Sequence, residues 1–471
     1  MVTKNIYRLG LLFIFLCVFL MQTDAEVLND STLNELIKLG LPVVIVDTEG
    51  GIEPTYEEVD APEGCLGGSI RNATKEPGRV VVKDTAGIIY DSGNFVEDES
   101  GMTVKVRGNW TARRPKKPYR IKLQKKADLL GRGEKRFSDK TWLLLPFFDL
   151  NEMIGLKVSE LMEMEWTPQF RFVNLVFNDD FRGLYLLMEA VERNADCRIN
   201  VKKTGFIVEL DPYWWNEPVY LPSSVELPLN YTFKYPDDED VTEEQMSYIG
   251  QVLLEAESAM EDSTGLYEQK IDVESFARWM LAHDILGNTD GAGSNIFLSK
   301  YDDTETSLLK MPCLWDYEVI MKSEEWDDLH GRYYFHRLFN NSDSTFANRY
   351  KELWEQNKDR VFNELFAFLN DYLNSDIRKA VDASIKLNNN RWARYTYKLS
   401  LSSKFISMAR NYFTNRKVWL DNAIRDLCSS DIVSSQESPD LKGPYYNLQG
   451  IRVWHPKRGI FIKGGKKVVL R

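Results

Sequence analysis

The stretch AHDILGNTDGAGSNIFLSK (282–300), followed after a short linker by MPCLWDYEVI (311–320), organises the whole chain. Its apolar beginning predicts the end of a helix that stops at Gly287, because glycine readily takes the left-handed conformation that ends helices. A polar loop then leads into NIFLSK, which predicts a strand. We expect a hairpin next and a second strand over LLKMPCLWDY (308–317).

Three polar side chains in this stretch suit phosphoryl transfer. That reaction needs a carboxylate to orient the acceptor hydroxyl and oxygen ligands for Mg²⁺. Asp290 is placed for the first role, whereas Asn295 and Asp316 are placed to hold the metal. The alternative is structural, since Asp and Asn are also ordinary turn residues. Asp316 favours the site interpretation, because an ionised carboxylate among apolar residues is costly without a positive partner.

The first 25 residues predict a signal peptide. Lys4 and Arg8 precede the apolar run LGLLFIFLCVFLM, and Thr23-Asp24-Ala25 resembles a cleavage site. The run is short for a membrane span, and we expect no transmembrane segment after cleavage. The mature protein is therefore expected to be exported, with a periplasmic, cell-surface or secreted location.

Composition limits the classes of partner and fold. With 43% hydrophobic and 12% aromatic residues, the chain can bury a sizeable core. A net charge of −12 argues against general nucleic-acid binding. Export permits two disulfides, but free thiols are an equal alternative for the four cysteines left after cleavage: Cys65, Cys197, Cys313 and Cys428.

The first part of the chain predicts strands and the second part predicts helices. Short alternating segments separated by Gly, Asp and Asn over residues 41–108 predict a meander or small sandwich, and further strands, including one hairpin, follow up to residue 211. From Val241 onward, apolar residues recur at helical spacing. The fold class is therefore α+β, with a β-rich N-terminal part and a helical C-terminal part.

A basic run stands out in this acidic protein. From Lys105 to Arg136 there are thirteen Lys or Arg residues and two acids. Most such runs are solvated surfaces. Alternation in RIKL, however, fixes Lys122 on a strand, which is how a kinase holds ATP phosphates. Arg107 and Gly108 could bring a guanidinium and bare backbone close to an anion.

The ordered motifs RGNW, KKPYRIKL, NDDFRGLYLLME, FIVELD, NTDGAGSN and LWDYE resemble the spore-coat-H (CotH) kinase family. The resemblance covers roughly residues 40–400 and suggests an exported bacterial member. It implies an atypical, protein-kinase-like two-lobed fold, with ATP and Mg²⁺ as cofactors and proteins as substrates. The expected domains are the kinase-like domain at 26–430, then a linker and a small β-rich tail at 431–471.

The resemblance also assigns site residues. Asp290 would be catalytic, Lys122 and Arg107 would bind the cofactor, and the metal would be held by Asn295, Asp316 and Glu318. The chain departs from the family pattern at Trp110-Thr111, where a serine is common, and at Glu318, where aspartate is more usual. It shows no glycine-rich phosphate loop of the usual kinase form.

Two functions from different classes follow. The first is an exported kinase-like phosphotransferase that moves the ATP γ-phosphate to a protein hydroxyl. The alternative is a non-catalytic surface binding or structural protein, with a cell-surface partner, on the same fold. A glycoside hydrolase is a third possibility, and only the paired acids Glu209 and Asp211 support it.

Overall fold

The computed structural model describes residues 30–225, 229–262, 265–291, 295–322, 328–395 and 398–429, together with short segments of the tail (445–446, 452–453, 459–463 and 466–470). The predicted signal peptide and the expected domain boundaries at 25 and 430 lie outside these residues. The chain divides into two compact units, 1–422 and 423–471.

A closed β-barrel forms the first part of the larger unit. Seven strands pair in the order β1-β9-β10-β8-β7-β6-β4, and β1 also pairs with β4, which closes the ring. The β1–β9 pair is parallel, and the other pairs are antiparallel. The strands are β1 (Val43–Thr48), β4 (Glu76–Asp84), β6 (Met102–Val106), β7 (Tyr119–Ala127), β8 (Asp139–Pro146), β9 (Phe170–Phe177) and β10 (Asp180–Glu189), with β5 (Gly87–Asp91) paired to β4.

Alternation along the strands fills the barrel interior. In β7, Tyr119, Ile121 and Leu123 are buried inside, whereas Arg120 and Lys122 point to the outer face. Strand period two requires this division, because successive side chains lie on opposite faces. Of the segments in the predicted meander, β4, β5 and β6 lie side by side in this sheet, with β4 between β5 and β6, and β7 and β8 extend it. Closure depends on the pairing of β1 with β4, whose paired residues are 30 to 40 positions apart in the chain.

A second, four-stranded antiparallel sheet lies in the same unit. Its order is β12-β13-β11-β14, so the strand that follows the polar loop pairs directly with FIVELD. The strands are β11 (Phe206–Asp211), β12 (Tyr220–Pro222), β13 (Asn230–Tyr235) and β14 (Ile296–Lys300). A separate hairpin joins β2 (Glu57–Asp60) and β3 (Gly68–Arg71).

The predicted second strand at 308–317 is not found. Only isolated bridges form there, at Leu309 and Lys310, and the following residues have no strand partner. Pro312 lacks a backbone N–H, and Asp316 has a left-handed backbone with φ of 59°. Both features oppose continuation of a regular strand.

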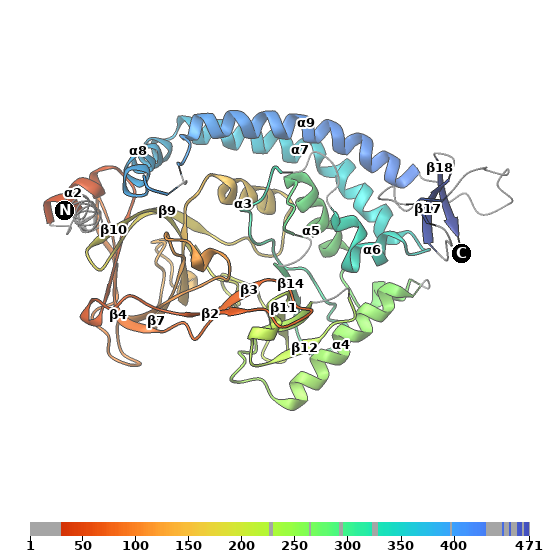
Figure 1. The fold of residues 1–471 in the computed structure, drawn as a ribbon, viewed down its shortest axis with the longest axis horizontal. Coiled ribbons are helices and arrows are strands. Elements are labelled where there is room, and N and C mark those ends of the chain that lie inside the picture. Colours follow the sequence, from red (N-terminus) through yellow and green to blue (C-terminus); the bar gives the residue numbers. More distant parts are fainter. Residues whose placement is uncertain are drawn as a thin grey trace, which may run out of the picture. The chain divides into compact units, whose positions relative to one another are not determined.

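Helices make up most of the remaining residues. In Figure 1, α7 and α9 run side by side, and Trp354 of α7 donates a hydrogen bond to Asp421 of α9 at 3.0 Å. The helices are α2 (Asp30–Lys38), α3 (Asn151–Leu161), α4 (Glu243–Glu261), α5 (Val273–Leu286), α6 (Tyr333–Phe339), α7 (Thr345–Asn374), α8 (Asp376–Arg391) and α9 (Ser402–Ser429). Among the described residues, no helix is long and apolar enough to cross a bilayer.

These elements confirm the α+β class, with a β-rich first part and a helical second part. The β-rich part is a closed barrel, and a kinase-like lobe stays a prediction. In the smaller unit, the tail forms a four-stranded sheet from β15 (Tyr445–Tyr446), β16 (Arg452–Val453), β17 (Gly459–Lys463) and β18 (Lys466–Leu470).

Candidate active site

The outer face of β6 and β7 carries a row of cations. Register pairs Lys105 with Arg120 and Thr103 with Lys122, and these side chains face away from the barrel core. Burial, followed by the neighbouring charge of Arg120, lowers the pKa of Lys105. Cations that crowd one another in this way create a surface that favours an anion.

Arg107 extends this row immediately after β6. Its N–H donates to the carbonyl of Pro118 at 3.1 Å, which prolongs the ladder beyond the strand. Burial lowers the pKa of the Arg107 guanidinium, and the carboxylate of Asp316 offsets part of that change. In the described part of the chain, no carboxylate lies within the 4.0 Å ion-pair distance of this guanidinium. Arg107 therefore retains capacity to bind an anion.

Helix α5 delivers the polar loop to the site. The helix begins at an Asp272 cap, whose side chain accepts from the N–H of Ser275 at 3.0 Å, and it ends at Gly287 with φ of 57°. The next residue, Asn288, is fully buried. Its side-chain oxygen accepts from the N–H of Asp290 at 3.0 Å, and its NH₂ donates to the carbonyl of Asp316 at 3.0 Å. Asn288 thus joins the two segments that carry the predicted acids.

The backbone at two predicted metal ligands is unusual. Asn295 has φ of 63° and Asp316 has φ of 59°. Asn and Asp tolerate this region better than other residues with a side chain, and residues with positive φ are enriched at turns and functional sites. The Asp316 carboxylate accepts from the N–H of Glu318 at 3.3 Å. This local turn helps to hold the Asp316 carboxylate.

Glu318 is already engaged by a cation. Its carboxylate lies 2.5 Å from the Arg114 guanidinium, which also covers the ring of Phe148 at 4.8 Å. The carbonyl of Glu318 accepts from the Asn151 side chain at 3.0 Å. Arg107 and Arg114 come from one β6–β7 connection, and both face the segment that contains Asp316.

Carboxyl groups from three elements influence one another here. Burial, then Asp316 and Asp149, raises the pKa of Glu152 to about 8. Burial, then the charge of Asp290, raises the pKa of Asp316 to about 6. Burial also raises the pKa of Asp149 to about 6, and burial followed by the charge of Glu318 raises that of Asp290. We call Asp149, Glu152, Asp290, Asp316 and Glu318 the acidic cluster.

A second pair of acids lies on one face of β11. Glu209 pairs with Lys234 at 2.8 Å. Burial, then the charge of Glu209, raises the pKa of Asp211 to about 7, although Thr232 donates to its carboxylate at 3.1 Å. The charge of Glu209 also acts on Arg107. Because Lys234 neutralises Glu209, the geometry gives no added support to a glycosidase pair.

The structure groups some predicted residues and leaves others apart. Arg107, Asp290, Asp316 and Glu318 influence one another, as described above. Lys122 is exposed on the outer face of β7, and no contact in the described residues links it to the acidic cluster. Its phosphate-binding role stays a prediction. Within the same residues, no three His, Cys, Asp or Glu side chains form a ready group of metal ligands.

Sequence reasoning missed several contributors. Asn288 lies unremarked in the polar loop, and no sequence signal marks Asn151 or Glu152. Arg114 was counted only as one cation of the basic run. The sequence signal for Arg114 was its place seven residues after Arg107, in the same loop. The burial of Asn288 and Glu152 depends on tertiary contacts and left no local pattern.

The cysteines described by the structure are free thiols. Cys65 and Cys197 are half-buried, and Cys313 is fully buried. Burial raises the pKa of Cys197 to about 11, so it has little thiolate character. The side chain of Cys428 lies outside the described part of the chain.

Comparison with known proteins gives one match. The family model described as CotH kinase protein matches residues 104–420, which is more than half of the chain and includes every predicted site residue. No curated protein matches the chain significantly. The match begins within β6 and ends within α9, so it covers the cationic row, the polar loop and the acidic cluster. The chain therefore belongs to the CotH kinase family.

Proposed function

We propose that this protein transfers the γ-phosphate of ATP to a protein hydroxyl with the help of Mg²⁺. The observation that carries the proposal is that the Arg107 guanidinium lies close enough to the acidic cluster to interact with the charge of Asp316, a member of that cluster. A nucleoside triphosphate bound to a divalent cation suits both groups at once: its phosphates attract the protein cations, and its metal ion attracts the carboxylates.

The carboxyl groups fit a hard divalent cation. The pKa values of Glu152 and Asp316 are raised because burial disfavours their charged forms and neighbouring carboxylates add to the effect. Mg²⁺ prefers oxygen ligands and typically uses one or two carboxylates together with phosphates and waters. A ready group of three protein carboxylates is therefore unnecessary. When bound, Mg²⁺ would neutralise charge on the transferring phosphate.

Each residue has a distinct role in this proposal. Asp290, held by Asn288, orients the acceptor hydroxyl and takes its proton. Asp316, Asn295 and Glu318 supply oxygens to the metal, while Arg114 fixes the direction of the Glu318 carboxylate.

The cations complete the assignment. Arg107 binds phosphate oxygens, and its planar guanidinium can offer two parallel donors. Lys105 lies deeper in the same row than the exposed Lys122, so it is a second candidate for the phosphate chain. Lys122 remains the candidate taken from the family resemblance.

The setting of this reaction is also a proposal. The signal-peptide pattern at residues 1–25 supports export to the periplasm, the cell surface or the medium. The partner is then a protein substrate or a cell-surface protein. The net charge of −12 supports a partner other than nucleic acid.

Nucleotide-dependent thermal shift tests the proposal. A ligand that binds only the folded state stabilises it by about 2.7 kcal/mol at a hundred times its Kd. We expect ATP with Mg²⁺ to raise the melting temperature, and either one alone to raise it less. Arg107→Ala should reduce the ATP effect, whereas Arg71→Ala, which removes a guanidinium on the β2–β3 hairpin, should not. Equal melting with and without Mg²⁺–ATP would favour the non-catalytic binding protein.

A further inference from the structure

A cavity lies away from the acidic cluster, at the other end of the basic run. Its volume is about 400 Å³, within the range of about 300–1,000 Å³ that is usual for ligand pockets. It lies between the β7–β8 connection, which contains the short helix η3 (Lys135–Phe137), and the loop that follows β10. The lining residues are Lys126, Lys135, Arg136, Ser138, Asn194 and Asp196.

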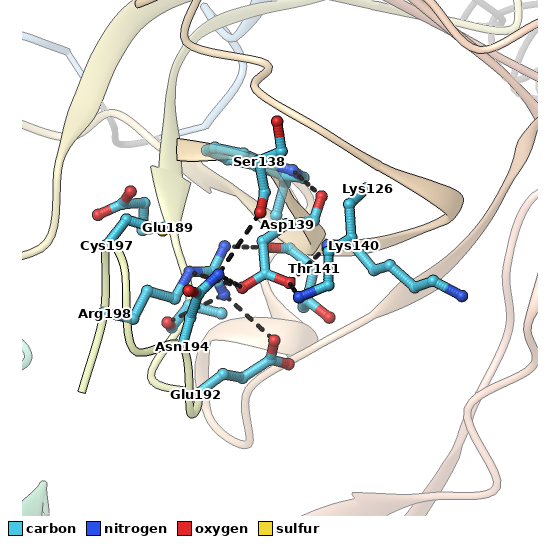
Figure 2. Close-up of polar contacts among 12 residues, drawn as sticks. Lys126, Ser138, Asp139, Lys140, Thr141, Glu189, Glu192, Asn194, Cys197 and Arg198 are labelled. Atoms are coloured by element: carbon cyan, nitrogen blue, oxygen red, sulfur yellow. Dashed lines mark hydrogen bonds and ion pairs between the residues drawn. The ribbon is translucent and has the colours of Figure 1, made fainter. Parts of the chain in front are cut away.

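Two residues that line this cavity, Lys126 and Asn194, belong to a polar network centred on the buried Asp139. Figure 2 shows Arg198, Asn194 and Lys126 converging on the carboxylate of Asp139. The distances are 3.4 Å from the Arg198 guanidinium, 3.0 Å from the Asn194 amide and 3.5 Å from the Lys126 ammonium. The Arg198 side chain is fully buried, and its other nitrogens donate to the Thr141 carbonyl at 2.6 Å and to Glu192 at 3.1 Å. Two residues that line the cavity, Lys126 and Asn194, are therefore held by a shared contact with Asp139.

The rim remains positive after this network is satisfied. Asp139 is shared with the buried Arg198, so it does not fully neutralise Lys126. Lys135 forms no ion pair within the described residues and is exposed. Arg136 pairs at 2.9 Å with Glu134, but both side chains are more than half exposed, and such surface pairs are weak. An incoming anion can displace Glu134 at little cost.

We propose that this cavity is a docking pocket for a phosphate monoester. A phosphate carries nearly two negative charges and three acceptor oxygens, which suit two lysines and an arginine. The Ser138 hydroxyl on the cavity wall offers a further donor. The negative charge of Asp196 repels the bound anion and therefore lowers its affinity. The last part of the basic run, from Lys126 to Arg136, has no role in the phosphotransfer site, and this pocket gives it a function.

The occupant is a phosphorylated segment of the protein substrate, an assignment that rests on the proposed function. Glu192 connects the two regions, since it pairs at 2.6 Å with Arg120 on the cationic row and at 3.1 Å with Arg198, which also pairs with Asp139. Arg120 and Lys126 are six residues apart on β7, roughly 20 Å at about 3.3 Å per residue. An extended peptide of about six residues spans that distance, so an existing phosphate would direct the next transfer to a nearby hydroxyl.

Fluorescence anisotropy with the full chain tests the pocket. The probes are a labelled twelve-residue peptide with one phosphoserine, its unphosphorylated twin, and inorganic phosphate as competitor. We expect the phosphopeptide to bind about tenfold more tightly than its twin, because charge-assisted hydrogen bonds are lost without the phosphate. Binding should weaken as salt rises, since the rim charges are exposed.

Variants locate the binding. Lys135→Ala/Arg136→Ala should lower phosphopeptide affinity about tenfold. Lys386→Ala/Lys404→Ala removes the same charge from exposed positions on α8 and α9 and should leave the affinity unchanged. Asp196→Asn should tighten binding. Equal affinity for the two peptides, or an unaffected Lys135→Ala/Arg136→Ala variant, would overturn the pocket.

Two further outcomes separate the sources and the hypotheses. Displacement by inorganic phosphate supports the shared chemistry, and a phosphopeptide that binds no better than inorganic phosphate would overturn the substrate segment as occupant. A melting shift with Mg²⁺–ATP but no phosphopeptide binding would overturn the pocket alone. Phosphopeptide binding without any Mg²⁺–ATP shift would support the pocket and count against the proposed phosphotransfer.

Discussion

The buried side chain of Asn288 donates to the carbonyl oxygen of Asp316 at 3.0 Å. The same side chain accepts from the N–H of Asp290 at 3.0 Å. One amide therefore sets the positions of the proposed catalytic acid and the proposed metal ligand relative to each other. Neither acid is held in this relation by regular secondary structure, because both lie in loops.

Replacement of this amide should impair both stability and transfer. Asn288→Ala leaves buried polar groups without partners, which costs about 1–3 kcal/mol in the free energy of unfolding. We expect the transfer rate kcat to fall more than tenfold, because small misplacements of reacting groups are expensive. The KM for ATP should change less, since Arg107 is untouched. Asn374→Ala, at an exposed helix end, is the control, and unchanged kcat in Asn288→Ala would contradict the positioning role.

A glycine in α3 packs closely against the same segment. A Cβ atom at Gly155 would overlap the ring of Tyr317, the residue next to Asp316. Gly155→Ala should therefore destabilise the fold and reduce transfer, although alanine usually stabilises a helix by about 1 kcal/mol. Gly250→Ala in α4 is the matched control, because its Cβ would meet Leu221 at an ordinary 3.5 Å. Urea unfolding that shows stabilisation in both variants would contradict the close packing.

The raised pKa of Glu152 predicts a pH dependence of stability. Below about pH 4.5 the group is protonated in both states and has no effect. Between there and its folded pKa of about 8, the unfolded state releases the proton first, so stability falls as pH rises. The loss is at most roughly 5 kcal/mol. Glu152→Gln should flatten the decline between pH 5 and 8 without divalent cations.

The control for this prediction lies on the same helix. Glu160 is exposed and pairs with Lys157 at 3.1 Å. Glu160→Gln should keep the decline of the parent protein. Parallel stability profiles for the parent and Glu152→Gln, measured by urea unfolding, would show that Glu152 is not the group that titrates.

The sequence was informative where local pattern decides structure. Alternation in RIKL placed Lys122 on the outer face of β7, and the hairpin around Asn178-Asp179 was readable from its turn residues. Asp316 is recognisable as a candidate site residue because it is an acid among apolar residues. The fold class and the family followed from the order of such motifs.

The remaining features depend on contacts between distant residues. Barrel closure requires β1 to pair with both β4 and β9, and no local signal specifies either pairing. The 308–317 segment had the apolar composition of a strand, but Pro312 and the left-handed Asp316 prevent a ladder. Glu152 became part of the site only because α3 packs near the Asp316 segment.

The central claim is tested most directly by phosphate transfer from γ-labelled ATP with Mg²⁺, measured for the parent protein and Asp316→Asn. The protein itself and casein serve as phosphate acceptors, and the melting temperature shows whether each variant is folded. We expect the parent to transfer phosphate and the variant to lose about 10²-fold or more of the rate. The substitution removes the carboxylate that is proposed to bind Mg²⁺ and so to stabilise the charge that develops in the transition state. Its melting temperature should change little. Equal transfer by the two proteins would contradict the account by removing Asp316 from the site.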